Sequence, residues 1–176
     1  IGLGSISLTP LELTSFYNCL ASAGTYYSPS FIKQINLSDS TLLKKVSEKK
    51  KIVLNSKNTI IINHLLKSPF DTALSSYTYP SLGKYQTNNT FGGKTGSTDS
   101  TNWVVGFNPK YTIGVYVGND DNQNINDTKL ARKIFQEIAN SLTENQKDIY
   151  YQTPDSLKSF TLYNSLINKK SKVYYY

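Results

Sequence analysis

Several residue types that mark common functional classes are scarce in this 176-residue chain. Cysteine occurs once, at Cys19, which excludes an internal disulfide and predicts a small buried residue. Histidine also occurs once, at His64 inside an apolar stretch, where a structural role is far more common than a catalytic one. Because histidine, cysteine and acidic residues form no cluster, the sequence predicts no metal site, and it points to no cofactor.

Long apolar runs are absent too, so neither a signal peptide nor a membrane-spanning segment is recognisable. Arginine, the usual reader of nucleic-acid bases, occurs once. The formal net charge is +7, but most lysines are dispersed and no basic stripe carries interleaved aromatic residues. We therefore expect no nucleic-acid partner, whereas a basic face near anionic lipid stays open.

The most informative segment spans residues 91–98, which we predict to be a polar, glycine-rich strand. Side chains alternate along a strand, so Thr95 and Ser97 share one face and Lys94 points to the other. The long stem of Lys94 can bring its ammonium back toward the same cleft. Gly96 lacks a side chain and suits the close approach of a second backbone.

Two hydroxyls and a cation beside a bare glycine can hold a carboxylate while an extended peptide pairs with the strand edge. Taken alone, this three-residue match is explained better by a surface strand with a solvated lysine. The following residues strengthen the functional interpretation, because strand-like runs at 103–107 and 111–117 flank an Asn108-Pro109 turn. Gly106 and Gly114 lie in these runs and would let a helix pack closely.

A phosphate-binding loop is the competing interpretation, because Gly93-Lys94-Thr95 ends like one. That motif needs a glycine five residues earlier, where Asn88 stands. It also needs a helix directly after the lysine, and the pattern here predicts a strand. We therefore reject a phosphate-binding loop.

The combined pattern resembles the transpeptidase domain of penicillin-binding proteins. In that family a Lys-Thr-Gly strand precedes a tryptophan strand, a turn with proline, and a strand ending in Val-Gly-Asp-Asp, and residues 94–121 follow this order. Upstream, residues 9–12 match the family's Thr-Pro-Leu-Glu segment and form a capping box with proline at the first helical position. The resemblance covers residues 1 to about 142. Thr101 departs from it, since the family usually has aspartate two residues before the tryptophan.

The resemblance implies an α+β fold, an antiparallel sheet with packed helices of the serine penicillin-binding and β-lactamase type, present only in part. It implies catalytic roles for Lys94 and Ser97. It also implies that Thr95, Gly96 and Ser97 bind substrate: the two hydroxyls hold its carboxylate, and the Ser97 N–H helps to form the oxyanion hole.

The family's nucleophile opens a buried helix in a Ser-x-x-Lys motif, and a Ser-x-Asn motif follows it. Three Ser-x-x-Lys matches occur here, beginning at Ser30, Ser47 and Ser81. Chance explains them in a chain rich in serine and lysine. Ser56 begins a Ser-x-Asn match, so Ser30, Ser56 and Lys94 occur in the family's order. The three motifs are nevertheless too close together in the sequence for the family. We therefore expect the nucleophile to precede Ile1, and the chain to be a fragment that is inactive alone.

By resemblance, the function is D,D-transpeptidation of peptidoglycan stem peptides through an acyl-serine intermediate, with β-lactams binding at the same site. The nearest match is the bifunctional class, in which a glycosyltransferase domain comes first. Expected partners are stem peptides, β-lactam antibiotics and the missing N-terminal half of the same protein. That half would anchor the protein on the extracytoplasmic face of the bacterial membrane. Alternatives are a non-catalytic wall-associated module with the same fold, or a D,D-carboxypeptidase or β-lactamase relative.

The remaining segments are predicted as scaffold. We expect residues 36–53 to form a loop, with a strand at 51–54. Three helices are expected: one with Leu13, Phe16, Tyr17 and Leu20 on one face, one capped by Ser56 or Asn58, and one capped by Asp127 or Thr128 that carries a stripe of Leu130, Ile134, Ile138 and Leu142. Residues 1–142 are assigned to the transpeptidase domain, and 143–176 to a tail or the start of a small extension.

Overall fold

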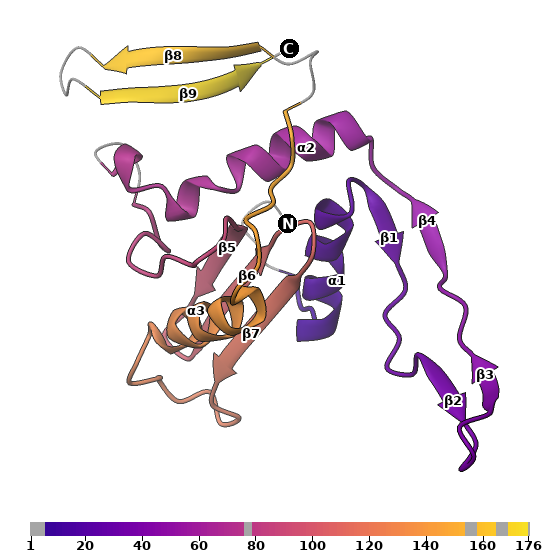
Figure 1. Ribbon diagram of the computed structural model, residues 1–176. Helices are drawn as coiled ribbons and strands as arrows, with labels where there is room; N and C mark the ends of the chain where they lie inside the picture. The colour runs from indigo at the N-terminus through magenta and orange to yellow at the C-terminus, as the bar shows by residue number, and fades with distance from the viewer. Residues whose placement is uncertain (1–5, 76–78, 154–157, 165–168, 176) are drawn as a thin grey trace.

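A computed structural model describes residues 6–75, 79–153, 158–164 and 169–175 (Figure 1). At its centre is a three-stranded antiparallel sheet of β5 (Gly92–Ser97), β6 (Thr101–Phe107) and β7 (Thr112–Gly118), in the order β5-β6-β7. The predicted strands and the Asn108-Pro109 turn are therefore confirmed. With helices on this sheet, the fold is α+β, as the sequence implied.

Two helices pack against β6 and β7, α1 (Pro10–Ala21) and α3 (Leu130–Thr143). Each helix approaches a glycine: a Cβ added to Gly114 would meet Thr14 of α1, and one added to Gly106 would meet the Phe135 ring of α3. Residue 106 pairs with 113, so residues 106 and 114 point to opposite faces of the sheet. The helices thus cover opposite faces, and the predicted role of both glycines is confirmed.

The main core lies between β6, β7 and α3. It contains Val104, Ile113 and Val115 of the sheet and Ala131, Phe135 and Ala139 of the helix. The predicted α3 stripe is therefore wrong in most of its members, because Leu130, Ile138 and Leu142 are exposed and only Ile134 packs on the core. Small alanines on either side of one phenylalanine let the helix come closer to the sheet than the bulkier stripe would allow.

Helix α1 begins with the predicted capping box, in which Thr9 and Glu12 bond each other's backbone N–H. Its buried residues are Cys19, Leu20 and Ala21. Burial of Cys19 is as predicted, but Phe16 is 53% exposed, so its predicted place with Leu20 on the core face is wrong. The buried residues of the helix thus lie at its C-terminal end and do not form a full-length stripe.

A hairpin arm, residues 25–52, extends away from the sheet (Figure 1). Strand β1 (Thr25–Tyr27) pairs with β4 (Lys50–Ile52), and β2 (Gln34–Asn36) pairs with β3 (Leu42–Lys45). The strand predicted at 51–54 is present as β4, which begins one residue earlier and ends at Ile52, but the predicted loop over 36–53 is wrong where it contains β3. Lysine-rich strands with exposed side chains lack the apolar alternation that identifies a strand in sequence.

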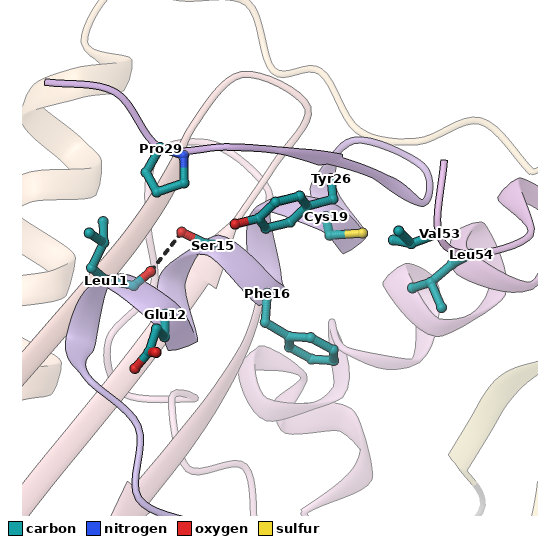
Figure 2. Close-up of a pocket in the computed structure, with 9 residues that line it drawn as sticks. All are labelled: Leu11, Glu12, Ser15, Phe16, Cys19, Tyr26, Pro29, Val53 and Leu54. Atoms are coloured by element: carbon teal, nitrogen blue, oxygen red, sulfur yellow. Dashed lines mark hydrogen bonds between the residues drawn. The ribbon is translucent and has the colours of Figure 1, made fainter. Parts of the chain in front are cut away.

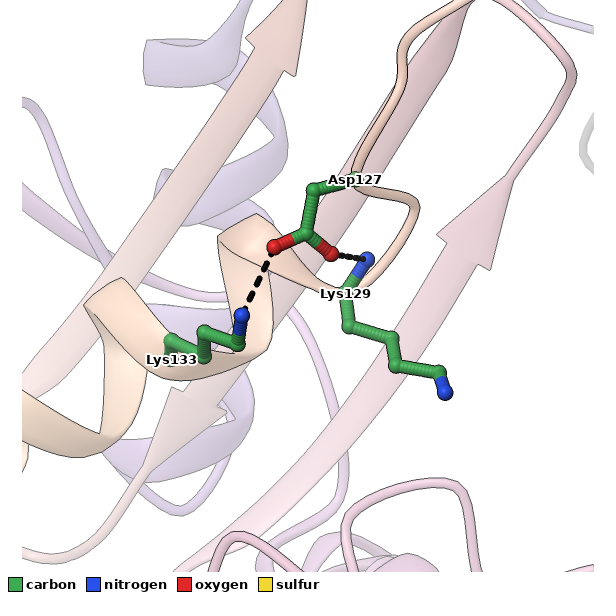
Figure 3. A network of polar contacts seen from close by, with 3 residues as sticks. All are labelled: Asp127, Lys129 and Lys133. Atoms are coloured by element: carbon green, nitrogen blue, oxygen red, sulfur yellow. Dashed lines mark hydrogen bonds and ion pairs between the residues drawn. The ribbon is translucent and has the colours of Figure 1, made fainter.

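Helix α2 (Ser56–Leu65) is capped one residue earlier than predicted, by Asn55, whose Oδ1 accepts from the N–H groups of Lys57 and Asn58. Helix α3 begins after Lys129 and has no side-chain cap, so the predicted caps Asp127 and Thr128 are wrong. Asp127 instead accepts from the Lys129 N–H at 2.8 Å and from Lys133 Nζ at 2.7 Å (Figure 3). Both bonds lower the pKa of Asp127, and the bond from Lys133 has the larger effect.

Two short 3₁₀ helices, η1 (Ser68–Phe70) and η2 (Thr72–Leu74), join α2 to the loop before β5. After α3 the chain returns to the core, where the Tyr150 hydroxyl donates to the Asn63 carbonyl and Tyr151 to that of Ala21. Farther on, β8 (Lys158–Asn164) pairs with β9 (Lys169–Tyr175). Residues 154–157, 165–168 and 176 of the predicted tail lie outside the described residues.

No helix within the described ranges is both long and apolar enough to cross a membrane.

Candidate functional site

Strand β5 carries all the predicted site residues and forms one edge of the described sheet. At its start the outer edge is covered, because the Gly93 N–H donates to the Leu66 carbonyl at 2.8 Å and η1 packs beside it. Farther along, at Thr95 to Ser97, no described strand pairs with that outer edge. The Lys-Thr-Gly segment therefore lies where an added strand could pair.

The ladder pattern shows which backbone groups point outward. In an antiparallel pair, hydrogen-bonded and non-hydrogen-bonded residue pairs alternate. The Thr98 N–H donates to the Thr101 carbonyl, so Ser97, which pairs with Asn102, belongs to a non-hydrogen-bonded pair. Gly93, four residues before Ser97, also belongs to a non-hydrogen-bonded pair, and its N–H accordingly points outward to Leu66. The N–H and C=O of Thr95 and Ser97 consequently face the open edge.

Lys94 is exposed, and its Nζ donates to the Thr95 carbonyl at 2.7 Å. Its side chain leaves the strand on the face opposite to that of Thr95. Since the Thr95 carbonyl points to the open edge, the ammonium lies at that edge too. A positive charge therefore stands beside the outward backbone groups of β5.

The two hydroxyls of the segment have different surroundings. Thr95 Oγ1 donates to Ser81 Oγ at 2.9 Å, whereas Ser97 is exposed at the end of the strand. The contact with Ser81 was not foreseen, because no local pattern links residues fourteen positions apart. The loop before β5 thus holds the Thr95 hydroxyl, while that of Ser97 faces solvent.

Gly96 is the least crowded of the three glycines of β5. A Cβ added there would meet only the Trp103 Cβ, at 3.7 Å, which is ordinary contact. Trp103 is its cross-strand neighbour, and the indole packs against Tyr116 with ring centroids 4.5 Å apart. The fold itself does not require glycine here, and the space beside Gly96 is free for a ligand.

Two other features lack the chemistry of a site. His64 is buried, and its pKa is lowered by burial first and by Lys67 second. Between α1 and the base of the hairpin arm, a pocket of about 320 Å³ is lined mainly by apolar side chains (Figure 2). Two of its polar members bond at α1: Ser15 donates to the Leu11 carbonyl, and the Glu12 carboxylate accepts from the Thr9 N–H. No group of metal ligands occurs within the described ranges.

Comparison with known proteins identifies the family. Residues 1–140 match the family described as "Penicillin binding protein transpeptidase domain". The chain belongs to this family. That match includes α1, the hairpin arm and the whole β5-β6-β7 sheet, so the predicted resemblance is confirmed.

Individual relatives agree. Penicillin-binding protein 2D of Bacillus subtilis is 27% identical over 160 residues, which are 88% of this chain and 23% of that protein. Penicillin-binding protein 1A of Aquifex aeolicus is 32% identical over 124 residues, 68% of this chain and 16% of that protein. The chain thus spans about a quarter or less of the length of these relatives.

A solved structure of penicillin-binding protein 1A from Haemophilus influenzae has the same fold, with a TM-score of 0.76. It is 18% identical, and the match covers 98% of this chain and 32% of that chain. The predicted type of fold is therefore confirmed by a solved transpeptidase-family structure.

In this transpeptidase-family chain, none of the Ser-x-x-Lys matches opens a helix. Ser30 lies in the hairpin arm, where its Oγ donates to the Ile32 carbonyl at 2.8 Å. Ser47 lies between β3 and β4, and Ser81 begins a turn. Ser56 is the first residue of α2, but no Ser-x-x-Lys match begins there. Of these serines, Ser81 is the one that contacts β5.

Proposed function

We propose that this chain supplies the substrate-binding strand of a peptidoglycan D,D-transpeptidase. The observation that carries the proposal is the open edge of β5, where outward backbone groups of Thr95 and Ser97 lie beside the Lys94 ammonium. An extended stem peptide can add to such an edge as a strand, with the cation near its terminal carboxylate.

Each residue of the strand has a distinct role. Lys94 makes the cleft electropositive and lies near the serine of a Ser-x-Asn motif outside this chain. The hydroxyls of Thr95 and Ser97 donate to the carboxylate of the stem peptide or the β-lactam, and for this the Thr95 O–H turns from Ser81 Oγ to the ligand. The backbone N–H of Ser97, together with that of the nucleophile, stabilises the oxyanion. Gly96 leaves room for the substrate against the strand.

The reaction uses a serine that precedes Ile1. Its oxygen adds to the carbonyl carbon of the penultimate D-alanine, while a base takes its proton. The bond to the terminal D-alanine breaks, and that amine leaves with the proton. An amine of a second stem then attacks the resulting ester, which forms the cross-link and returns a proton to the serine. A β-lactam acylates the same serine.

The whole protein is proposed to be of the bifunctional class, with a glycosyltransferase domain and a membrane anchor before this chain. Its partners are then peptidoglycan stem peptides and β-lactam antibiotics, at the extracytoplasmic face of the bacterial membrane. Residues 143–176 are proposed to be a tail or the start of a small extension. Support for this setting comes from the likeness to penicillin-binding proteins 2D and 1A.

The test measures acylation of the full-length protein by a fluorescent penicillin. Lys94→Ala should slow acylation on the order of a hundredfold, because it removes charge from the cleft. It should leave the melting temperature nearly unchanged, since Lys94 is exposed. Gly96→Val should block acylation by steric clash with the ligand. Ser97→Ala should slow it by about tenfold or less, because the main-chain donor remains.

Lys110→Ala is the matched control, since Lys110 is an exposed lysine at the other end of the sheet, beside the β6–β7 turn. It should not change the rate. Loss of acylation in Ser97→Ala with a nearly silent Lys94→Ala would contradict the assigned roles. A wild-type protein that never labels would favour the non-catalytic wall-associated module.

A further inference from the structure

Asn102 of β6 is an anomaly in the core. Its side chain is 0% exposed, and neither Oδ1 nor Nδ2 has a hydrogen-bond partner in the part of the chain that the structure describes. An unpaired buried amide costs stability, and asparagine is also disfavoured inside strands. An apolar residue would serve the fold better here, so a functional reason for the amide should be sought.

The register places that amide beside the candidate site. Asn102 is the direct cross-strand partner of Ser97, and both side chains lie on the same face of the sheet. The pair is of the non-hydrogen-bonded kind, in which Cα atoms are only about 4.5 Å apart and side chains come closest. Ser97 is exposed at the open edge, whereas Asn102 is buried behind it. No other buried polar side chain is paired directly with a residue of the Lys94 to Ser97 segment within the described ranges.

We propose that Asn102 is a positioning residue for Ser97, an inference that rests on the proposed transpeptidase function. When substrate binds, a change of the Ser97 rotamer brings its Oγ to the Asn102 Nδ2, which donates to it. Because the Asn102 amide then donates to a lone pair of Ser97 Oγ, the Ser97 O–H points to the carboxylate of the stem peptide or β-lactam and donates to it. The amide, which has no partner among the described residues, is thus available to orient the hydroxyl in the complex.

A double-mutant cycle on the full-length protein tests this, with acylation by a fluorescent penicillin as the readout. Asn102→Val replaces the amide by an apolar residue that suits a strand. It should slow acylation about three- to tenfold, the loss of one hydrogen bond, without lowering the melting temperature. In the Ser97→Ala background the same change should have no further effect, because the hydroxyl that it orients is gone. Asn102→Leu, which has the same branching as asparagine, should behave alike and covers the case in which valine does not fit.

Asn63→Ala is the matched control for burial. Asn63 is also 0% exposed, but its Nδ2 donates to the Leu20 carbonyl at 2.9 Å, so its loss should lower the melting temperature. Asn63→Ala should change the acylation rate by the same factor in the wild-type protein and in the Ser97→Ala variant. Additive effects of Asn102→Val and Ser97→Ala would overturn the proposal, as would a melting temperature that falls along with the rate.

The two levels of inference separate in the same experiment. If Lys94→Ala slows labelling while both Asn102 variants label at the wild-type rate, the proposed function stands and the role of Asn102 is wrong. If the wild-type protein does not label, both are wrong.

Discussion

At the scale of single residues, the proposed function depends on a few atoms at the edge of β5. The alternation of Lys94, Thr95 and Ser97 across two faces follows from the period of a strand, and the register agrees with it. The contact between Thr95 and Ser81 does not follow from any local rule, because it depends on how the loop before β5 folds back.

A residue-scale prediction concerns pH. Burial and Lys67 lower the pKa of His64 from its ordinary value of 6.5, so the unfolded state binds this proton more tightly than the folded state. Stability should therefore fall as the pH drops below about 6.5, and this contribution should level off below the folded-state pKa. Thermal denaturation of the full-length protein between pH 8 and about pH 5 measures it. His64→Gln should flatten the slope, and an unchanged slope would show that other groups cause it.

At the scale of elements, close approach of helix and sheet decides which residues are buried. Helix α3 buries Phe135 between two alanines, and the ring occupies the space that Gly106 leaves open. Three of the four larger aliphatic residues of α3, among them Ile138, are exposed. A count of apolar residues at helical spacing does not predict which face of α3 is buried, because it ranks positions by size and not by fit to the opposing strand.

This packing predicts that Gly106→Ala destabilises the domain by about 1–3 kcal/mol, because the new methyl group overlaps the Phe135 ring. Urea denaturation of the full-length protein measures the change. Adding Phe135→Leu should recover part of the loss, since the smaller side chain makes room. Gly96→Ala is the stability control and should cost little, because its Cβ would meet only Trp103. Equal losses at both glycines would contradict the packing argument.

At the scale of the whole molecule, the chain spans about a quarter or less of its relatives and exposes many large apolar side chains. Phe31 of the hairpin arm is 89% exposed, for example. Exposed apolar surface and an open strand edge favour association with other protein surfaces. Expressed alone, the chain should therefore be poorly soluble or dimeric. Addition of the upstream part that the proposed function requires should restore a cooperative melt.

The proposed position of the nucleophile predicts where a β-lactam attaches. The chain alone should form no covalent adduct with a fluorescent penicillin, so a denaturing gel should show no labelled band near 19.7 kDa. When the upstream part is supplied as a separate polypeptide, the label should appear on that part. A band at 19.7 kDa that disappears in Ser30→Ala would place the nucleophile in this chain and refute the proposal.

The sequence by itself determined the features that depend on local order. These are the strand at Lys94, the hairpin after it, the capping box at Thr9 and the family, because turn residues, strand alternation and motif order are encoded along the chain. Only the tertiary structure decided the pairing of the lysine-rich arm, the buried face of α3, the contact of Ser81 with Thr95, and the place of Asn102 behind Ser97. The arm and the place of Asn102 depend on the register of a hairpin. The buried face of α3 and the Ser81 contact depend on which distant segment comes to lie opposite, and side-chain fit across that gap leaves no mark on neighbouring residues.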